Sequence, residues 1–187
     1  MSAQTTEEKF IEYHNERFEK YGDSPMIFWN SKESQEKRFE AAIKLFTRLS
    51  HFSVVDIGCG NGDFYFYLIE KGYKNFRYTG FDINPSFVLF GTEKMNSLPL
   101  EKVQSLNKHC LYHPFINEGG FEEAEKFMIE NGGVDYAVAS GIYCFGSYQT
   151  SIQNNYFYDF NKIFPLLNEG YACNFLSQYS DTRNPDV

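Results

Sequence analysis

The sequence predicts an α/β fold, a three-layer α/β/α sandwich around a mostly parallel sheet, with two helices ahead of it. Segments with helical periodicity alternate with short, apolar, β-branched segments at 52–57, 76–83, 134–140 and 170–177. Strands that alternate with helices form parallel sheets with helices on both faces. At 187 residues, 42% of them apolar, the chain is long enough for one domain with its own core.

Two helices are predicted before the sheet begins. The first spans residues 5–21, where apolar residues form an uneven helical stripe. The second follows Ser31, which is a typical N-cap residue, and carries apolar residues at the i, i+3, i+4, i+7 spacing. We therefore interpret residues 1–50 as an N-terminal helical cap segment and residues 51–187 as the core, together one compact domain.

The first two helices of the core have clear end signals. Residues 63–72 form a predicted helix that Gly72 closes at the C′ position. Residues 84–95 form a predicted helix with Asn84 as its N-cap and Pro85 at its first position. Each helix follows a predicted strand directly, which is the order expected of a parallel sheet.

The second half of the core is less regular. Residues 108–115 are a weak strand candidate, and residues 121–133 form an amphipathic helix with acidic residues in its first turn. A long helix is predicted over about 149–167, where Pro165 bends or shortens the last turn. The final predicted strand is 170–177.

The segment VVDIGCGNGDF, residues 54–64, carries the most specific chemical signal. Gly58, Gly60 and Gly62 alternate between a predicted strand and a predicted helix. Glycine inside a regular element costs about 0.5–1 kcal/mol relative to alanine, so three of them indicate a close approach to the backbone. Ligands of open α/β sheets bind at the carboxyl ends of the strands, where the next helix offers free N–H groups.

The charges beside this loop favour a cationic nucleoside ligand. Asp82 ends the next predicted strand, where a carboxylate can accept both hydroxyls of a ribose. A dinucleotide usually requires G-x-G-x-x-G, but Asp63 stands where the third glycine belongs, and Asp56 would repel a pyrophosphate. S-adenosylmethionine has no phosphate and carries a sulfonium and an ammonium group, so the charges favour this methyl donor.

Four segments together resemble the class I S-adenosylmethionine-dependent methyltransferases: VVDIGCGNGDF, YTGFDINPSFV, VDYAVASGIYCF and LLNEGYACNFLS. More narrowly, YHNERFEKYGDSP and W-x-S-x-E-S-Q-x-x-R-F are similar to a bacterial group of small-molecule-type enzymes of this class. The resemblance covers residues 13–179, or nearly the whole chain. It implies a Rossmann-like fold, S-adenosylmethionine as cofactor and S-adenosylhomocysteine as product.

The resemblance also implies which residues contact the cofactor. The backbone of Gly58, Cys59 and Gly60 would lie against the methionine part. Asp56 would act on the ammonium group, directly or through water. Asp82 would hold the ribose hydroxyls.

Further contacts are implied around these. Ile83 would lie against the adenine with Asn84 nearby, and Ala139 and Ser140 would flank the sulfonium. In the segment before the sheet, which folds over the cofactor in this group, the implied residues are Trp29, Gln35 and Arg38, the last of which could reach the methionine carboxylate.

Several of these residues also have purely structural interpretations. Trp29 can fill the core, Arg38 can be a solvated helix residue, and Asn84 caps a helix in either case. Cys59 needs only to be small.

The sequence departs from the family pattern in two places. The third strand usually ends in an acidic or polar residue against the adenine, whereas CLYHPF leaves Tyr112 and His113 as candidates. After 170–177 only QYSDTRNPDV remains, which is too short for the helix and antiparallel hairpin that normally follow. We therefore expect a truncated or shortened form, weakly stable, whose exposed last strand allows a homodimer.

The predicted function is S-adenosylmethionine-dependent methyl transfer to a small-molecule acceptor. The net charge of −8 disfavours nucleic acid as a partner, and ASGIYCF lacks the Asn-Pro-Pro-Tyr type of motif that base-amino methyltransferases use. The sequence identifies no general base, so the catalytic residues stay unassigned. Two alternatives remain open: a degenerate domain that binds the cofactor or a nucleoside without catalysis, and an NAD-dependent oxidoreductase.

The composition also suggests a compartment. No apolar run approaches the ~20 residues that cross a bilayer, and the N-terminus lacks a secretory pattern. The four cysteines form no C-x-x-C pair, which is typical of a reduced cytoplasmic protein without a metal site.

Overall fold

The computed structural model describes residues 5–48, 50–99, 115–143 and 160–175. Within them, five parallel strands form one sheet in the order β3-β2-β1-β4-β5. The strands are β1 (Ser50–Ile57), β2 (Lys74–Asp82), β3 (Phe115–Glu118), β4 (Val134–Tyr143) and β5 (Leu167–Phe175). The strand order reverses between β1 and β4, and such a reversal opens a ligand crevice at the carboxyl ends of the strands.

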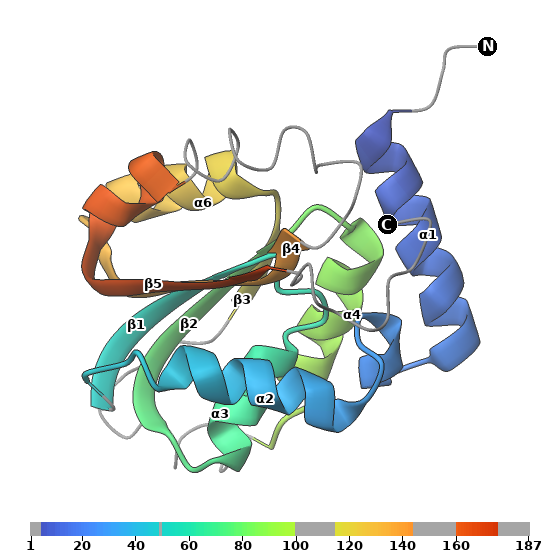
Figure 1. Ribbon diagram of the computed structural model, residues 1–187, viewed down its shortest axis with the longest axis horizontal. Helices are drawn as coiled ribbons and strands as arrows, with labels where there is room; N and C mark the ends of the chain where they lie inside the picture. The colour runs from blue at the N-terminus through green and yellow to red at the C-terminus, as the bar shows by residue number, and fades with distance from the viewer. Residues whose placement is uncertain (1–4, 49, 100–114, 144–159, 176–187) are drawn as a thin grey trace.

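Helices cover both faces of the sheet, as the sequence predicts (Figure 1). One face carries α2 (Lys32–Ile43), α3 (Asp63–Glu70) and α4 (Pro85–Asn96), and the other carries α6 (Phe121–Glu130). A further helix, α1 (Thr6–Tyr21), lies beyond the carboxyl ends of the strands, at the right of the view. The predicted Rossmann-like three-layer fold is confirmed.

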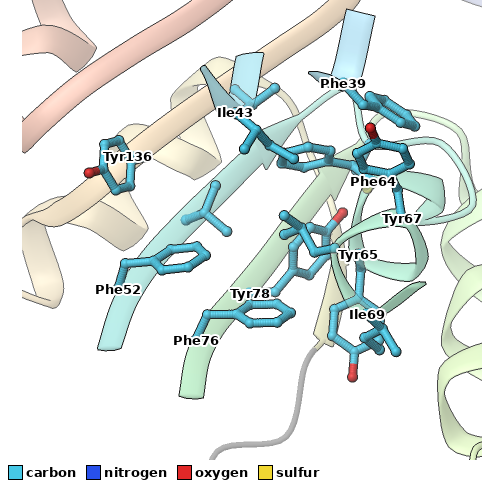
Figure 2. Close-up of a cluster of buried hydrophobic side chains, with 14 of the residues drawn as sticks. Phe39, Ile43, Phe52, Phe64, Tyr65, Tyr67, Ile69, Phe76, Tyr78 and Tyr136 are labelled. Carbon is cyan, nitrogen blue, oxygen red and sulfur yellow. The ribbon is translucent and has the colours of Figure 1, made fainter. Parts of the chain in front are cut away.

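Alternate residues of β1 point to opposite faces of the sheet and pack into two separate hydrophobic clusters. Phe52 and Val54 belong to the cluster under α2 and α3, while Val55 and Ile57 belong to the cluster under α6. This alternation follows from the two-residue period of a strand. Figure 2 shows the first cluster, in which aromatic rings from β1, β2 and α3 pack against one another.

The predicted N-termini of α1, α2 and α4 and the predicted C-terminus of α3 agree with the structure. Thr5 caps α1 and Ser31 caps α2, each accepting a hydrogen bond from a backbone N–H of the first turn. Asn84 caps α4 with Pro85 at the first position. Gly72 follows α3 with a φ of 84°, a conformation that favours glycine.

The third strand continues further along the chain than predicted. Residues Phe115–Glu118 pair with Thr79–Asp82 of β2, and of the predicted strand 108–115 all but Phe115 lie outside the described residues. Tertiary packing selects this position, because the side chain of Ile116 fits where Gly62, Gly80 and Gly91 leave room. Tyr112 and His113, the candidates for adenine contact, lie outside the described residues. The strand ends instead in the acidic residue Glu118.

The last strand begins earlier than predicted. Phe164–Leu166 form a 3₁₀ turn, η3, that contains Pro165, and β5 starts at once with Leu167 pairing with Val134. The predicted shortening of the helix at Pro165 is confirmed. The strand begins at Leu167, three residues before the predicted start at residue 170. Among the described strands β5 lies at the sheet edge, and association through it stays a prediction. None of the helices in the described part of the chain has the length and apolarity to span a membrane.

The helix α1 is attached to the core through aromatic rings and polar bonds. The ring of Phe18 packs edge-on against Phe87 and Phe90 of α4, with centroids 5.7 and 5.0 Å apart. Asn84 donates from Nδ2 to Oδ1 of Asn15 over 2.9 Å. The predicted cap segment therefore packs directly on α4 and on the turn that precedes it.

One residue of α1 makes this attachment sensitive to pH. His14 is buried among Phe10, Phe28 and Phe87, and its Nδ1 lies 2.9 Å from the carbonyl of Phe10. Burial disfavours the imidazolium and lowers the pKa of His14 to about 4. The folded state therefore binds fewer protons than the unfolded state between pH 6.5 and 4, and His14 destabilises the fold as the pH falls through this range.

We expect His14→Gln to remove this contribution. Relative to the variant, the parent should lose up to roughly 3 kcal/mol of unfolding free energy as the pH falls from 6.5 to 4. Urea unfolding of both proteins at several pH values measures this difference. Other groups that titrate in the range cancel in the comparison, and parallel stability curves would contradict the prediction.

Candidate cofactor site

The glycine loop joins β1 to α3 in a left-handed backbone conformation. Gly58, Gly60 and Gly62 have φ values of 70°, 56° and 79°, which residues other than glycine rarely adopt. The N–H groups of Gly58 and Cys59 both donate to the carbonyl of Phe81 in β2, over 2.8 and 3.0 Å. The loop is thereby fastened to the end of the neighbouring strand.

Side chains of the protein itself come close to these glycines. A Cβ on Gly58 would lie 2.1 Å from Cγ2 of Ile142, and a Cβ on Gly60 would lie 2.7 Å from the ring of Phe28. Ile142 comes from the end of β4, and Phe28 from the cap segment. The loop therefore lies between the cap segment and the end of β4, and at Gly58 and Gly60 it has no room for a side chain.

Asp82, the last residue of β2, holds the loop through hydrogen bonds. Its Oδ2 accepts from the N–H of Gly60 over 2.7 Å, and its Oδ1 accepts from the N–H of Asn84 over 2.9 Å. The side chain is buried, and burial raises the pKa of Asp82 to about 6 although both N–H donors lower it. Each oxygen keeps a further lone pair with which it could accept a hydroxyl hydrogen.

Asp56 is buried and lies two residues before Gly58. Its Oδ2 accepts a hydrogen bond from the hydroxyl of Tyr78 over 2.7 Å. Burial raises the pKa of Asp56 to about 7 against the lowering effect of Tyr78, and the pKa of the Tyr78 hydroxyl lies well above its usual value. The tyrosine therefore stays a donor at any physiological pH.

These two carboxylates lack compensating charge. Within the described residues, no Lys, Arg or His nitrogen lies within 4.0 Å of an oxygen of Asp56 or Asp82. The next acid, Asp63 at the start of α3, does have a partner, because Lys94 lies 3.3 Å from it. Two buried acids without cations therefore flank the glycine loop.

The end of β4 supplies the other wall of the site. Ala139 is fully buried, and the Oγ of Ser140 is buried with no hydrogen-bond partner among the described residues. Gly141 has a φ of 92°, and its N–H donates to Oδ1 of Asn174 over 2.7 Å where the pairing with β5 becomes irregular. An unsatisfied buried hydroxyl is costly, so Ser140 is suited to a polar ligand group.

The structure brings two predicted cap residues to this wall. The ring of Trp29 reaches to 3.0 Å from the position of a Cβ on Gly141, and the guanidinium carbon of Arg38 lies 4.4 Å from the centre of the Trp29 ring. Arg38 also donates to the carbonyl and hydroxyl of Ser34, each over 2.6 Å. Trp29 and Arg38 are therefore placed together at the β4 side of the loop.

Three other predicted residues, Gln35, Asn84 and Ile83, lie around the loop and make different contacts. Gln35 donates from Nε2 to Asp63 over 2.8 Å, so it connects α2 to the start of α3. Asn84 is fully buried, and its side chain is already bonded to Asn15 and to the N–H of Ser86. Ile83 is half-buried and lies near Gly120, beyond the end of β3. The side chain of Asn84 thus attaches α1 as well as capping α4.

Cys59 has a packing role in this structure. It is buried, and its Sγ lies 2.7 Å from the position of a Cβ on Gly80. Burial and the nearby acids raise the pKa of its thiol well above the usual value. The thiol therefore stays protonated, which agrees with the interpretation that this position needs only a small residue.

Sequence reasoning missed four residues of the site. Tyr78 holds Asp56, Phe28 and Ile142 lie on the glycines, and Glu118 ends β3 next to Asp82 in the strand register. Tyr78, Gly80 and Asp82 alternate on one face of β2, so the pairing of Asp56 with Gly80 makes Tyr78 a diagonal neighbour. The acid before the glycine pair in FINEGG was the available signal for Glu118.

Comparison with known proteins supports the fold and the loop. Residues 49–109, which include the glycine loop and Asp82, match a family model described as "Methyltransferase domain". No curated protein sequence gives a significant match.

Solved structures give matches over most of the chain. Mycolic acid cyclopropane synthase CmaA1 complexed with SAH and CTAB matches with 16% identity and a TM-score of 0.50, over 81% of this chain and 44% of that one. Its apo-form matches with 16% identity and a TM-score of 0.53, over 84% and 52%. The precorrin-6y C5,15-methyltransferase of Geobacter metallireducens GS-15 matches with 14% identity and a TM-score of 0.53, over 85% and 70%.

At these identities the likeness concerns the fold. The chain spans about half the length of the cyclopropane synthases that it matches. Residues 49–109 thus resemble a methyltransferase domain, and the chain has a Rossmann-like fold similar to that of the solved methyltransferase and cyclopropane synthase structures above.

Proposed function

We propose that this protein binds S-adenosylmethionine and transfers its methyl group to a small-molecule acceptor. The observation that carries the proposal is the pair of buried carboxylates, Asp56 and Asp82, on either side of a bare glycine loop. Buried charges without partners are unfavourable, so this site favours a cationic ligand. A pyrophosphate would add negative charge to it, which argues against a dinucleotide cofactor.

The residues present fit the methyl donor. The free lone pairs of Asp82 suit the ribose hydroxyls, and Glu118 lies beside Asp82 at the strand end, where the adenine would follow. The backbone of Gly58, Cys59 and Gly60 would hold the methionine part. The unpartnered Ser140 hydroxyl, beside the buried Ala139, would face the sulfonium from β4.

The cap would close the site from outside. Arg38 forms no ion pair within the described residues, and only one of its terminal nitrogens is engaged with Ser34. We assign it to the methionine carboxylate, with Trp29 packed between the guanidinium and the β4 wall. Gln35 would position the start of α3 through Asp63, and Ile83 would flank the adenine.

When bound, S-adenosylmethionine supplies an activated methyl carbon for in-line displacement. The chain would therefore mainly orient the two reactants and exclude water, and such orientation accounts for much of a barrier reduction. The wall made by Ile142, Phe28 and Trp29 is apolar, which suits water exclusion. A net charge of −8 opposes nucleic-acid binding and so favours a small-molecule acceptor over DNA or RNA.

Calorimetric titration tests the ligand class. We expect S-adenosylhomocysteine to bind with one-to-one stoichiometry and NAD⁺ to give no heat of binding. The single Trp29 offers a second readout, because a ligand against Gly141 should change its fluorescence. Binding of NAD⁺ in preference to S-adenosylhomocysteine would overturn the proposal.

A second experiment separates a transferase from a catalytically degenerate binding domain. The protein is incubated with methyl-labelled S-adenosylmethionine and a small-metabolite extract. We expect label in a product of low mass, formed only with the native protein. Binding without any transfer would assign the chain to the degenerate class.

A further inference from the structure

Asp56 and Tyr78 form a buried pair that methyl transfer itself does not use. Asp56 and Tyr78 have 3% and 1% of their surface exposed, and Tyr78 belongs to the core cluster under α3. The hydroxyl of Tyr78 donates to the Asp56 carboxyl over 2.7 Å. Asp56 lies only two residues before Gly58. A charge on this carboxyl would therefore act on whatever ligand lies in the loop.

The groups that face Asp56 are acidic or neutral. They are Tyr78 and Asp82 from β2, Cys59 from the loop and Asp63 from α3. The ammonium of Lys94, on α4, is engaged with Asp63 and with Asp23. Nothing positive in this set stabilises an ionised Asp56, which agrees with the direction in which burial moves its pKa.

We propose that Asp56 ionises when the positively charged methyl donor binds, so that binding releases one proton, and that Tyr78 is the positioning residue for this carboxyl. The inference rests on the proposed function, since the cation comes from the ligand. The O–H bond of the Asp56 carboxyl breaks, its proton passes to the solvent, and the remaining carboxylate carries the charge opposite to the ligand. The Tyr78 hydroxyl keeps its own proton and donates to the carboxylate throughout.

This coupling makes the site sensitive to ligand charge. S-adenosylmethionine carries an ammonium and a sulfonium, S-adenosylhomocysteine carries the ammonium alone, and methylthioadenosine carries neither. A nearby opposite charge favours the ionised acid. The preference for the donor over the spent product would therefore grow as the pH rises, if the sulfonium is the cation that Asp56 senses.

The test is calorimetric titration of the full chain with these three compounds between about pH 6 and pH 8. Titration in two buffers of different ionisation enthalpy counts the protons released. For S-adenosylmethionine we expect proton release near neutral pH and an affinity that rises about tenfold over this range. Methylthioadenosine should show neither effect, and S-adenosylhomocysteine identifies whether the ammonium or the sulfonium is sensed.

Three variants assign the effect to residues. Asp56→Asn should make the affinity independent of pH, and Tyr78→Phe should move the midpoint to higher pH because the carboxylate loses its donor. Tyr65→Phe is the matched control, since the Tyr65 ring lies 5.3 Å from the Tyr78 ring and its buried hydroxyl has no hydrogen-bond partner within the described part of the chain. Its pH profile should equal that of the parent protein.

Each outcome decides the proposal. Binding of S-adenosylmethionine without proton release would overturn it and leave the proposed function intact. A pH slope that survives Asp56→Asn and disappears in Asp82→Asn would assign the proton to Asp82 and also overturn it. If Asp56→Asn does not fold, the shift in Tyr78→Phe against Tyr65→Phe decides alone. Failure of all three compounds to bind at any pH would refute the proposed function itself.

Discussion

Gly58→Ala will destabilise the protein by roughly 2–4 kcal/mol and abolish binding of S-adenosylhomocysteine. Two causes add at this position. The φ of 70° is unfavourable for alanine, and the new Cβ would lie 2.1 Å from Cγ2 of Ile142. Because Ile142 is β-branched and packs at the end of β4, it cannot move away without disturbing that strand. Urea unfolding measures the stability loss, and calorimetry measures the binding.

Two further variants separate these causes. Gly72→Ala has a similar φ of 84° but open space around its Cβ, so it should cost only about 1 kcal/mol. Ile142→Ala combined with Gly58→Ala should recover the part of the loss that comes from the collision. If Gly58→Ala were no worse than Gly72→Ala, close packing of the loop against β4 would be refuted.

Asp82→Ala will show the second large effect, on both stability and ligand affinity. The carboxylate is buried and accepts from the N–H groups of Gly60 and Asn84. Its removal leaves two buried donors unpaired, which costs about 1–3 kcal/mol each. If the same carboxylate holds the ribose, affinity for S-adenosylhomocysteine should fall by a further 1–3 kcal/mol or about 5- to 150-fold.

A carboxylate at the opposite end of the sheet provides the control. Asp135 accepts from the N–H and hydroxyl of Ser53 over 2.7 and 3.0 Å, at the amino ends of β1 and β4. Asp135→Ala should therefore lower stability by a comparable amount and leave the ligand affinity unchanged. Equal affinity of the Asp82→Ala and Asp135→Ala proteins for S-adenosylhomocysteine would remove the ribose role of Asp82.

Local signals in the sequence were sufficient for most elements. The caps at Ser31 and Asn84 and the glycine after α3 predicted helix ends that the structure has. These signals work because a cap residue satisfies backbone groups a few positions away, so the relevant physics is contained in a short stretch. The glycine loop and the acid at the end of β2 were found for the same reason.

The third strand shows where local signals fail. The described residues of β3 pair with β2, and Ile116 packs where Gly62, Gly80 and Gly91 leave room. The sequence of the segment 108–115 contains no information about those three glycines. It therefore leaves Tyr112 and His113 as candidates for the adenine contact, whereas the strand ends at the acidic residue Glu118.

The sequence by itself determined the strand–helix alternation, the position of the ligand loop and the acidic character of the site, since each follows from residue types close together in the chain. Only the tertiary structure decided how Asp56 and Tyr78 pair, which side chains cover the glycines and where Trp29 and Arg38 lie. Most of these contacts join residues more than 20 positions apart, for example Asp56 with Tyr78 and Trp29 with Gly141. They depend on sheet register and on packing, which are set by the whole core at once.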